Sequence, residues 1–364
     1  MISILPISKP KKTWRRMIAM VELVAFPTEI EQMDNPSLQG RPICLVNGEQ
    51  GSIVIAASPE AQASGIQIGM TWLMAKEYCP ESVRVVARPA RYGEISRQIM
   101  AALRAFSPEV EVVAANEAFL DLTSCQSYYR HEPDLIGRLI QETVNAASSG
   151  LPCSIGISGD KTSARWAAKQ QQGGLTVLHP NDAEDCLRSI PLAELCGIGR
   201  GMVAFFAQYD VHCCGDMKKI PVSVPAQRYG NLGRQLWLMA QARDPSPVNV
   251  RCMASTSLSK GKILLPQTCD LSILQSHFML TAEKLALQLR RQGQSVADFN
   301  IGIRCPEGWR MAWFQPPEPT NNSLEIFRLS KQFLRQYWFG DAVQQIRIQA
   351  APPVLEELQP DFFA

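Results

Sequence analysis

The segment "SPEVEVVAANEAFLDLT", residues 107–123, decides the fold of this chain. Its apolar and β-branched side chains predict a strand, and acidic side chains stand along that strand. Where two acids could stand together, the sequence has Asn116 followed by Glu117. Carboxylates are ligands that divalent ions such as Mg²⁺ prefer. The segment therefore raises the question of whether an acidic metal site in this protein is complete.

Strands and helices alternate in the sequence around this segment. An apolar run that contains Glu22 predicts a buried strand at residues 17–26. Residues 42–58 predict a hairpin, because two apolar runs flank "NGEQGS". The predicted strand "CSIGISG" precedes a predicted helix for which Asp160 is a suitable N-cap. This alternation over the first half of the chain predicts an α/β or α+β sheet domain.

The second half of the sequence predicts a helical region, a linker and a separate α+β unit. Within helical residues 186–240, "LCGIGRG" has the shape of a helix-hairpin-helix turn whose backbone N–H groups would face a phosphate. Gly-x-Gly turns are common, so an ordinary turn is the alternative. Residues 241–250 form a proline-bearing linker, and residues 251–350 follow the β-α-β-β-α-β order of a ferredoxin-like unit. Such a sheet either lies along a nucleic-acid groove or is an ordinary small domain.

Length and composition indicate a multidomain globular protein without a membrane segment. A chain of 364 residues is long enough for two or three domains. Apolar residues make up 46%, and no apolar run approaches the roughly 20 residues of a membrane span. The run at residues 17–26 lacks a signal-peptide cleavage site. The eleven cysteines form no CxxC pair, and "HCC" at 212–214 has no second ligand pair, so reduced thiols in the cytoplasm are expected rather than a zinc site.

The net charge of +2 is close to neutral, but basic residues are unevenly distributed. Residues 1–16 contain five basic residues and no acid, which predicts a disordered basic leader. Residues 248–350 contain twelve Lys and Arg against seven Asp and Glu, an excess of five. Local basic character of this kind suits a phosphate backbone, although a solvated charged face explains it equally well.

In order and spacing, four segments resemble the Y family of DNA polymerases, the translesion class. They are "MVELVAFPTEIE", "AASPEAQASGIQIGM", "SPEVEVVAANEAFLDLT" and "LPCSIGISGDKTSARWAAK", to which "CGIGRG" and "RYGNLGRQLW" are added. The resemblance implies an α+β right hand of palm, fingers and helical thumb, with a C-terminal ferredoxin-like little finger. The implied division is palm 17–38 and 87–185, fingers 39–86, thumb with helix-hairpin-helix 186–240, linker 241–250, little finger 251–350 and flexible tail 351–364.

The resemblance implies that the metal positions of the family are degenerate in this chain. Glu22 stands at the first metal-binding Asp, Val24 at a second acidic position, and Asn116 with Glu117 at the Asp-Glu pair. An Asn brings no charge to offset a divalent ion, and Glu in place of Asp moves the carboxylate by about 1 Å, which is commonly costly. No catalytic residue, metal or cofactor is therefore expected.

The nucleotide-binding positions are altered as well. Pro27 replaces the aromatic residue that excludes ribonucleotides. Pro59 and Gln62 replace a Tyr and an Arg that hold the incoming triphosphate. Only Lys161 and the already named Glu117 are as the family has them. The four former nucleotide positions are thus expected to be vestigial.

Noncatalytic members of this family, the ImuB type, share such degraded acids and a segment like "LSKGKILLPQT" at residues 258–268. The resemblance implies a cytoplasmic adaptor in bacterial DNA-damage tolerance and SOS mutagenesis. Its partners would be primer-template DNA, the sliding clamp, a RecA-like protein and an error-prone replicative-type polymerase. An active translesion DNA polymerase that uses Glu22, Glu117 and Mg²⁺ is the alternative, and a decayed copy without function is a third.

Candidate DNA and clamp contacts follow from these segments. DNA contacts are expected in the glycine hairpin and in the little finger, although lysines there could equally be solvated: Gly197, Ile198, Gly199, Arg200, Gly201, Lys260 and Lys262. The C-terminal residues resemble the clamp-binding pattern Gln-Leu-x-Leu-Phe, from which they depart at the second and fourth positions: Gln359, Pro360, Asp361, Phe362 and Phe363. Five-residue likenesses also arise by chance, but a terminal tail can dock as an extended segment.

Overall fold

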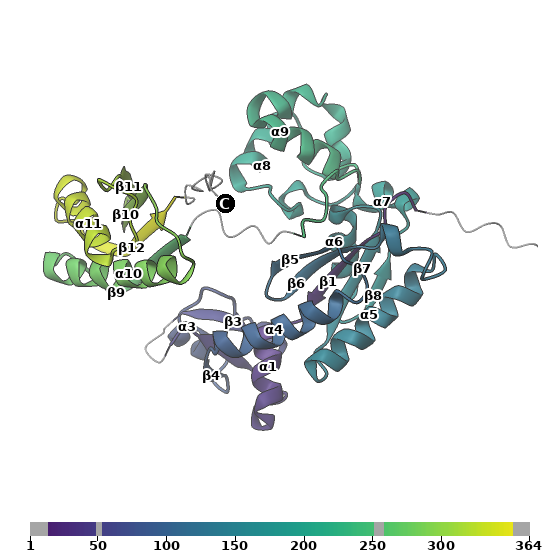
Figure 1. Cartoon of the computed structure of the whole chain (residues 1–364), viewed down its shortest axis with the longest axis horizontal. Coiled ribbons are helices and arrows are strands. Elements are labelled where there is room, and N and C mark those ends of the chain that lie inside the picture. Colours follow the sequence, from purple (N-terminus) through teal and green to yellow (C-terminus); the bar gives the residue numbers. More distant parts are fainter. Residues whose placement is uncertain (1–13, 49–52, 251–257, 352–364) are drawn as a thin grey trace, which may run out of the picture. The chain divides into compact units, whose positions relative to one another are not determined.

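The computed structural model describes residues 14–48, 53–250 and 258–351, in two units that span residues 1–252 and 253–364 (Figure 1). Each unit has its own sheet and hydrophobic core. Among the described residues, no helix is both long and apolar enough to span a bilayer.

Unit 1 contains a five-stranded sheet in the order β5-β6-β1-β7-β8, with β1 (Ile18–Leu23) at its centre. β1 is antiparallel to β6 (Glu117–Asp121) and to β7 (Cys153–Ser158), and β8 (Leu175–Val177) runs parallel to β7. All residues of β1 except the half-buried Glu22 are buried, which explains why an unbroken apolar run occupies the middle of the sheet. The buried strand predicted at residues 17–26 is confirmed.

The acidic segment is a hairpin and not the single strand that its pattern predicts. β5 (Val110–Ala114) turns at Ala115 and Asn116 into β6, and the two strands pair antiparallel. Apolar residues continue on both sides of this two-residue turn, so the sequence pattern shows no break. The Leu23 N–H donates to the Asn116 carbonyl at 2.8 Å and holds the turn against the end of β1.

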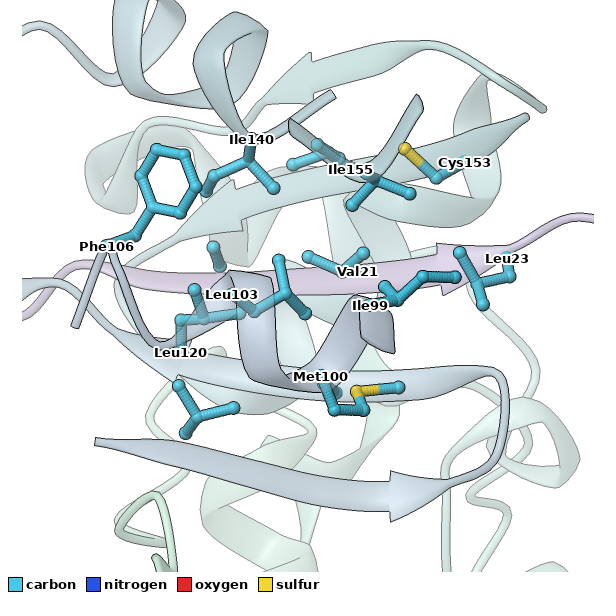
Figure 2. Packing of buried hydrophobic residues seen from close by; sticks show 14 of the residues in the cluster. Val21, Leu23, Ile99, Met100, Leu103, Phe106, Leu120, Ile140, Cys153 and Ile155 are labelled. Atoms are coloured by element: carbon cyan, nitrogen blue, oxygen red, sulfur yellow. The ribbon is translucent and has the colours of Figure 1, made fainter. Parts of the chain in front are cut away.

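Helices cover both faces of this sheet. α4 (Pro89–Leu103) and α5 (Pro133–Ser148) pack on one face, and Figure 2 shows Ile99 and Leu103 of α4 beside Val21 and Leu23 of β1. Alternate residues of a strand point to opposite faces, so Glu22 belongs to the other face. That face is covered by α6 (Lys161–Gln170), whose Ala164 and Ala168 form a buried cluster with Ile18, Met20 and Phe119.

Two local features fix α6 against the sheet. The Asp160 side chain accepts a hydrogen bond from the Ser163 N–H at 2.9 Å, so the predicted N-cap is confirmed. Gly156 on β7 lets the helix approach closely, because a Cβ there would lie 2.1 Å from the Ala164 carbonyl oxygen. Asp160 therefore sets where α6 begins, and Gly156 permits the short distance between α6 and the sheet.

A second sheet of unit 1, in the order β3-β2-β4, occupies the predicted fingers. β2 (Ile43–Val46) and β3 (Val54–Ala57) form the predicted hairpin, whose residues 49–52 lie outside the description, and β4 (Val83–Val86) is parallel to β2. The short helices of this region are α2 (Pro59–Ala63) and α3 (Trp72–Tyr78), and α1 (Phe26–Asp34) and η1 (Pro36–Leu38) precede it.

Residues 178–242 add a helical cluster around the fully buried Phe206. Its elements are α7 (Pro180–Leu187), η3 (Leu192–Glu194), α8 (Arg200–Ala207), η4 (Cys214–Lys219) and α9 (Ser223–Met239), and a further 3-10 turn, η2 (Thr123–Cys125), follows β6. The first helix of the predicted helix-hairpin-helix is thus only a single 3-10 turn, η3.

The predicted disordered leader is wrong for its last three residues. Trp14 is only 9% exposed, and its ring meets His179 edge-on at 5.3 Å. The Arg16 guanidinium donates to the carbonyl oxygens of Asp244 and Ser246 at 3.0 and 2.7 Å. A tryptophan and a multidentate arginine gain enough contacts to order this segment, which counting charges did not reveal. Residues 1–13 lie outside the description.

Unit 2 has the predicted β-α-β-β-α-β order (Figure 1). Its elements are β9 (Leu258–Thr268), α10 (Leu271–Arg291), β10 (Phe299–Cys305), β11 (Gly308–Phe314), α11 (Ser323–Tyr337) and β12 (Val343–Ala350). The sheet is antiparallel in the order β11-β10-β12-β9. Phe278, Phe299 and Phe333 form part of the core between one sheet face and the two helices.

Candidate active site

The acids at the implied metal positions meet on the face of the sheet that carries α6. Glu22 on β1 lies directly opposite Glu117 on β6 in the strand register. Directly opposed residues of an antiparallel pair have Cβ atoms about 4.5–5.5 Å apart and point to the same face. Both side chains are half-buried. The two acids that remain at the metal positions are therefore opposed glutamates on neighbouring strands.

The two other metal positions contribute no carboxylate. Asn116 is the second residue of the β5–β6 turn, where its carbonyl accepts from the Leu23 N–H. Val24 follows β1, and its N–H donates to the Pro152 carbonyl at 3.0 Å. Across residues 14–48, 53–250 and 258–351, no group of three or more His, Cys, Asp or Glu side chains is arranged to hold a metal ion.

α6 places cations at four-residue intervals over these acids. Residues four apart share one face of a helix, so Lys161, Arg165 and Lys169 form a single stripe that faces three strands. Each cation lies beside an acid of a different strand: Lys161 beside Glu111 of β5, Arg165 beside Glu117 of β6, and Lys169 near Glu22 of β1. We call these six residues the α6 charge ladder.

The first two rungs of the α6 charge ladder are close ion pairs. Lys161 Nζ lies 2.8 and 2.7 Å from the two Glu111 oxygens, and Glu111 Oε2 also accepts from the Asn249 N–H at 2.7 Å. Arg165 donates to Glu117 Oε2 at 2.8 Å. Both cations also lie over the Phe119 ring, at 4.8 Å for Lys161 and 5.1 Å for Arg165. The two residues that match the family pattern, Lys161 and Glu117, are thus already engaged by partners within the chain.

The third rung leaves Glu22 in an unfavourable electrostatic position. Burial raises the pKa of Glu22 above its ordinary value, and the opposed Glu117 carboxylate raises it further. Lys169 and Arg165 lower the pKa of Glu22 but do not cancel these effects. A raised pKa in this setting means that the charged form of Glu22 is destabilised by its surroundings.

This donor set does not fit a pair of magnesium ions. Two carboxylates and the Arg165 guanidinium sum to a charge of −1, whereas two Mg²⁺ ions bring +4 beside the negative charges of a triphosphate. Mg²⁺ also demands near-octahedral oxygen ligands, and the Glu117 oxygen that faces Arg165 is occupied by that hydrogen bond. A two-metal site would need Arg165 to move and further acids to be supplied.

Apart from Lys161 in α6, the former nucleotide positions lie in α1 and α2. Pro27 is in the first turn of α1, after Ala25, which has left-handed backbone angles (φ 46°). Pro59 opens α2 after Ser58, whose hydroxyl accepts from the Ala61 N–H. The Gln62 side-chain amide donates to the Ala57 carbonyl at 2.7 Å, at the end of β3.

Acids border these positions. Burial raises the pKa of Glu29 in the first turn of α1, and Glu60 in the first turn of α2 raises it further. The two carboxylates therefore lie close enough to repel each other. A triphosphate at this place would meet these two acids and would lack the Tyr and Arg that Pro59 and Gln62 replace.

The glycine hairpin presents backbone rather than side chains. Gly199 is the N-cap of α8, which has no side-chain cap, and Gly197 has a φ of 89°. Gly197, Gly199, Arg200 and Gly201 are exposed, and the half-buried Ile198 packs against the helical cluster. Exposed N–H groups at the start of a helix can receive a phosphate, as the sequence predicts.

The predicted lysines of unit 2 lie on strand β9, not in a loop. Lys260 and Lys262 pair with Ile348 and Ile346, so they belong to the helix-covered side at the edge of the sheet. Burial lowers the pKa of His277 on α10, and the positive charge of the nearby Lys262 lowers it further. The predicted clamp-binding residues Gln359 to Phe363 lie outside the described residues.

Sequence reasoning missed Glu111 and Arg165. Arg165 could have been found, since it follows Lys161 by one helical turn and a half-buried helix face should carry both. Glu111 could not, because only the hairpin turn brings β5 beside β6 and within reach of α6.

A cavity of about 360 Å³ lies beside the α6 charge ladder. Its lining includes the apolar side chains of Leu195, Leu236 and Met239.

Comparison with known proteins agrees with this fold. Residues 21–169 match the impB/mucB/samB family. DNA polymerase IV of Moorella thermoacetica is 30% identical over 327 residues, which cover 88% of this chain and 81% of that protein. DNA polymerase IV of Streptococcus pneumoniae is 30% identical over 286 residues, covering 76% and 79%.

A solved structure, a Y-family DNA polymerase chimera of Dbh and Dpo4, superimposes with a TM-score of 0.79 and covers 93% of this chain and 99% of its own. Its sequence identity of 17% supports the fold alone. The expected α+β fold of a Y-family polymerase is thereby confirmed. With the polymerase IV relatives and this shared fold, the chain belongs to the Y family of DNA polymerases.

Proposed function

We propose that this Y-family protein binds primer-template DNA without transferring nucleotides to it. The α6 charge ladder carries the proposal, because the acids that remain at the metal positions serve as partners of helix cations. Where the family pattern has an Asp-Glu pair, this chain has Asn116 in the hairpin turn and Glu117 bound to Arg165. Nucleotidyl transfer needs concentrated negative charge at that place to hold two metal ions.

DNA binding is supported by exposed backbone groups of unit 1 and by basic side chains of unit 2. The glycine hairpin at 197–201 offers exposed N–H groups to a phosphate. Unit 2 carries Lys260, Lys262 and further basic residues that would neutralise phosphates. The binding should therefore weaken steeply with salt.

The adaptor role of the ImuB type extends this proposal. We infer contact with a bacterial sliding clamp through Gln359, Phe362 and Phe363, and recruitment of a RecA-like protein and an error-prone polymerase. A pull-down of clamp by the full chain, compared with Phe362→Ala/Phe363→Ala, tests the clamp contact. Equal recovery of the clamp by both proteins would remove the tail from the interface.

Primer extension decides whether nucleotides are transferred. The full chain should bind a fluorescent primer-template in an anisotropy assay and yet leave the primer unextended with either Mg²⁺ or Mn²⁺. Glu117→Ala is the matched control, since it removes the family acid. Extension by the wild-type chain that disappears in Glu117→Ala would refute the noncatalytic proposal.

A DNA-directed DNA polymerase that uses Glu22 and Glu117 is the second candidate. The names of the relatives, DNA polymerase IV, favour this candidate over the first. It requires Arg165 to release Glu117 when Mg²⁺ and nucleotide arrive. Calorimetry with a nucleotide and Mg²⁺ in the presence of primer-template tests it, and the absence of nucleotide binding would count against it.

A further inference from the structure

The sheet of unit 2 has one face that its helices do not cover, and the strand register arranges its residues in three rows. Paired residues on neighbouring strands share a face, so the rows can be read from the pairing of β11, β10, β12 and β9. The rows are Trp309–Arg304–Gln345–Ile263, Met311–Gly302–Arg347–Gly261 and Trp313–Asn300–Gln349–Ser259. We call these twelve residues the open face.

Large apolar side chains stand exposed along one edge of the open face. Trp309, Met311 and Trp313 of the edge strand β11 are 40%, 38% and 57% exposed. Alternation along β11 places all three on the same side, while Ala312 and Phe314 point to the core. Exposing two indoles on one short strand costs free energy, because each leaves a large apolar area in water.

The open face is basic as well as aromatic. Arg304 is exposed and Arg347 half-buried, and no described residue forms an ion pair with either. None of the twelve residues is an Asp or a Glu. The face therefore combines unneutralised positive charge with flat aromatic groups, and it suits a polyanion that also has flat apolar surfaces.

The open face is uneven: Met311 lies over a glycine, and a cavity lies beside Arg304 on the side away from β11. Glycines occupy two of the four positions in the middle row, and a Cβ on Gly302 would lie 2.7 Å from Met311 Cγ. Met311 is thus the side chain that covers this glycine. Beside Arg304, a cavity of about 300 Å³ is lined by Ile263, Gln345 and neighbouring residues. A flat ring and a hydrogen-bonding edge can both be accommodated here.

We propose that the open face binds unpaired DNA by stacking bases on Trp309 and Trp313. Residues i and i+4 of a strand are about 13 Å apart, with Met311 midway between the two indoles. Aromatic side chains beside a basic surface are the general means of holding single strands, because every base has a flat face. Bases within a duplex are already stacked on one another, so this surface selects the unpaired strand. The proposal rests on the DNA binding proposed above and adds a strand preference to it.

Three fluorescent DNA probes of equal length test the proposal by anisotropy with the full chain: a single-stranded oligothymidine, the same backbone with abasic sites, and a duplex hairpin. Wild-type protein should bind oligothymidine about tenfold or more tighter than the abasic strand, since stacking needs bases. Trp309→Ala/Trp313→Ala should lose this preference and keep its affinity for the abasic and hairpin probes.

Two variants keep this experiment specific. Trp309→Phe/Trp313→Phe retains aromatic rings and should keep most of the preference for oligothymidine. Tyr128→Ala removes a ring of unit 1 that is 83% exposed, and it should leave all three affinities unchanged.

Each remaining outcome overturns the proposal. A wild-type protein that binds the hairpin but shows no preference for bases, or a double alanine variant that keeps the preference, refutes stacking on these indoles while the proposed DNA binding stands. Equal loss on all three probes in the double alanine variant assigns the indoles to folding or to a protein contact. Absence of binding to every probe by the wild-type chain refutes the proposed function as well.

Discussion

Replacing Glu22 with Gln is expected to stabilise unit 1 at neutral pH. Two carboxylates about 6 Å apart repel by about 3 kcal/mol at an effective dielectric constant of about 20. Arg165 offsets much of this through its pair with Glu117, and Lys169 offsets a further part. About 1 kcal/mol should remain, which agrees with the range for like charges opposed across two strands.

The pH dependence of this effect has a definite sign. The pKa of Glu22 is raised in the folded state, so protonation of this group favours folding. Its stabilising contribution is complete below the unfolded value of about 4.5 and is lost as the pH rises through the raised folded pKa. The gain from Glu22→Gln should therefore be full at pH 7 and absent near pH 4.

Scanning calorimetry of the full chain measures this gain, because separate units can give separate transitions. In a unit of this size, about 1 kcal/mol should raise the midpoint of the unit 1 transition by about 2–4 °C at pH 7. Glu117→Gln is the matched control and should lower the midpoint, since it leaves Arg165 without its carboxylate. A Glu22→Gln variant less stable than wild type at pH 7 would refute the reasoning.

Three further predictions concern the helix, the lysines and the ladder. Gly156→Ala should destabilise unit 1 by about 3 kcal/mol, because its Cβ would overlap the backbone of α6, and an unchanged calorimetric midpoint would contradict this close approach. Lys260→Ala/Lys262→Ala should weaken binding uniformly across DNA sequences and flatten the salt slope by up to about 2, so an unaltered slope would exclude these lysines from the interface. Arg165→Gln should raise the pKa of Glu22 in a carboxyl NMR titration, since Arg165 lowers it, and a fall would argue against their proximity.

Local signals in the sequence were sufficient for much of the fold. The apolar run around Glu22 identifies the central strand because a strand with neighbours on both sides and covered faces has few polar positions. Asp160 identifies the start of α6 because its side chain satisfies an N–H group that the helix leaves free. The order of unit 2 follows from its two long amphipathic helices between strands.

Contacts between distant segments could not be read in the same way. The turn at Ala115 and Asn116 is hidden because side chains on both sides suit a strand, and with it the approach of Glu111 to Lys161. The ordering of Trp14 depends on partners more than one hundred residues away. The open face depends on register, which places Trp309 and Trp313 on the side away from the helices.

The metal site itself is tested most directly by titrating the full chain with Mn²⁺ in the presence of primer-template and a non-hydrolysable nucleotide, with the free ion followed by electron paramagnetic resonance. If the cations of α6 engage the acids that remain at the metal positions, the wild-type chain and Glu117→Gln should bind the same small amount of Mn²⁺. If the wild-type chain instead binds two ions and Glu117→Gln binds none, the acids are free to hold metal ions. That result would contradict the account and would identify a working polymerase.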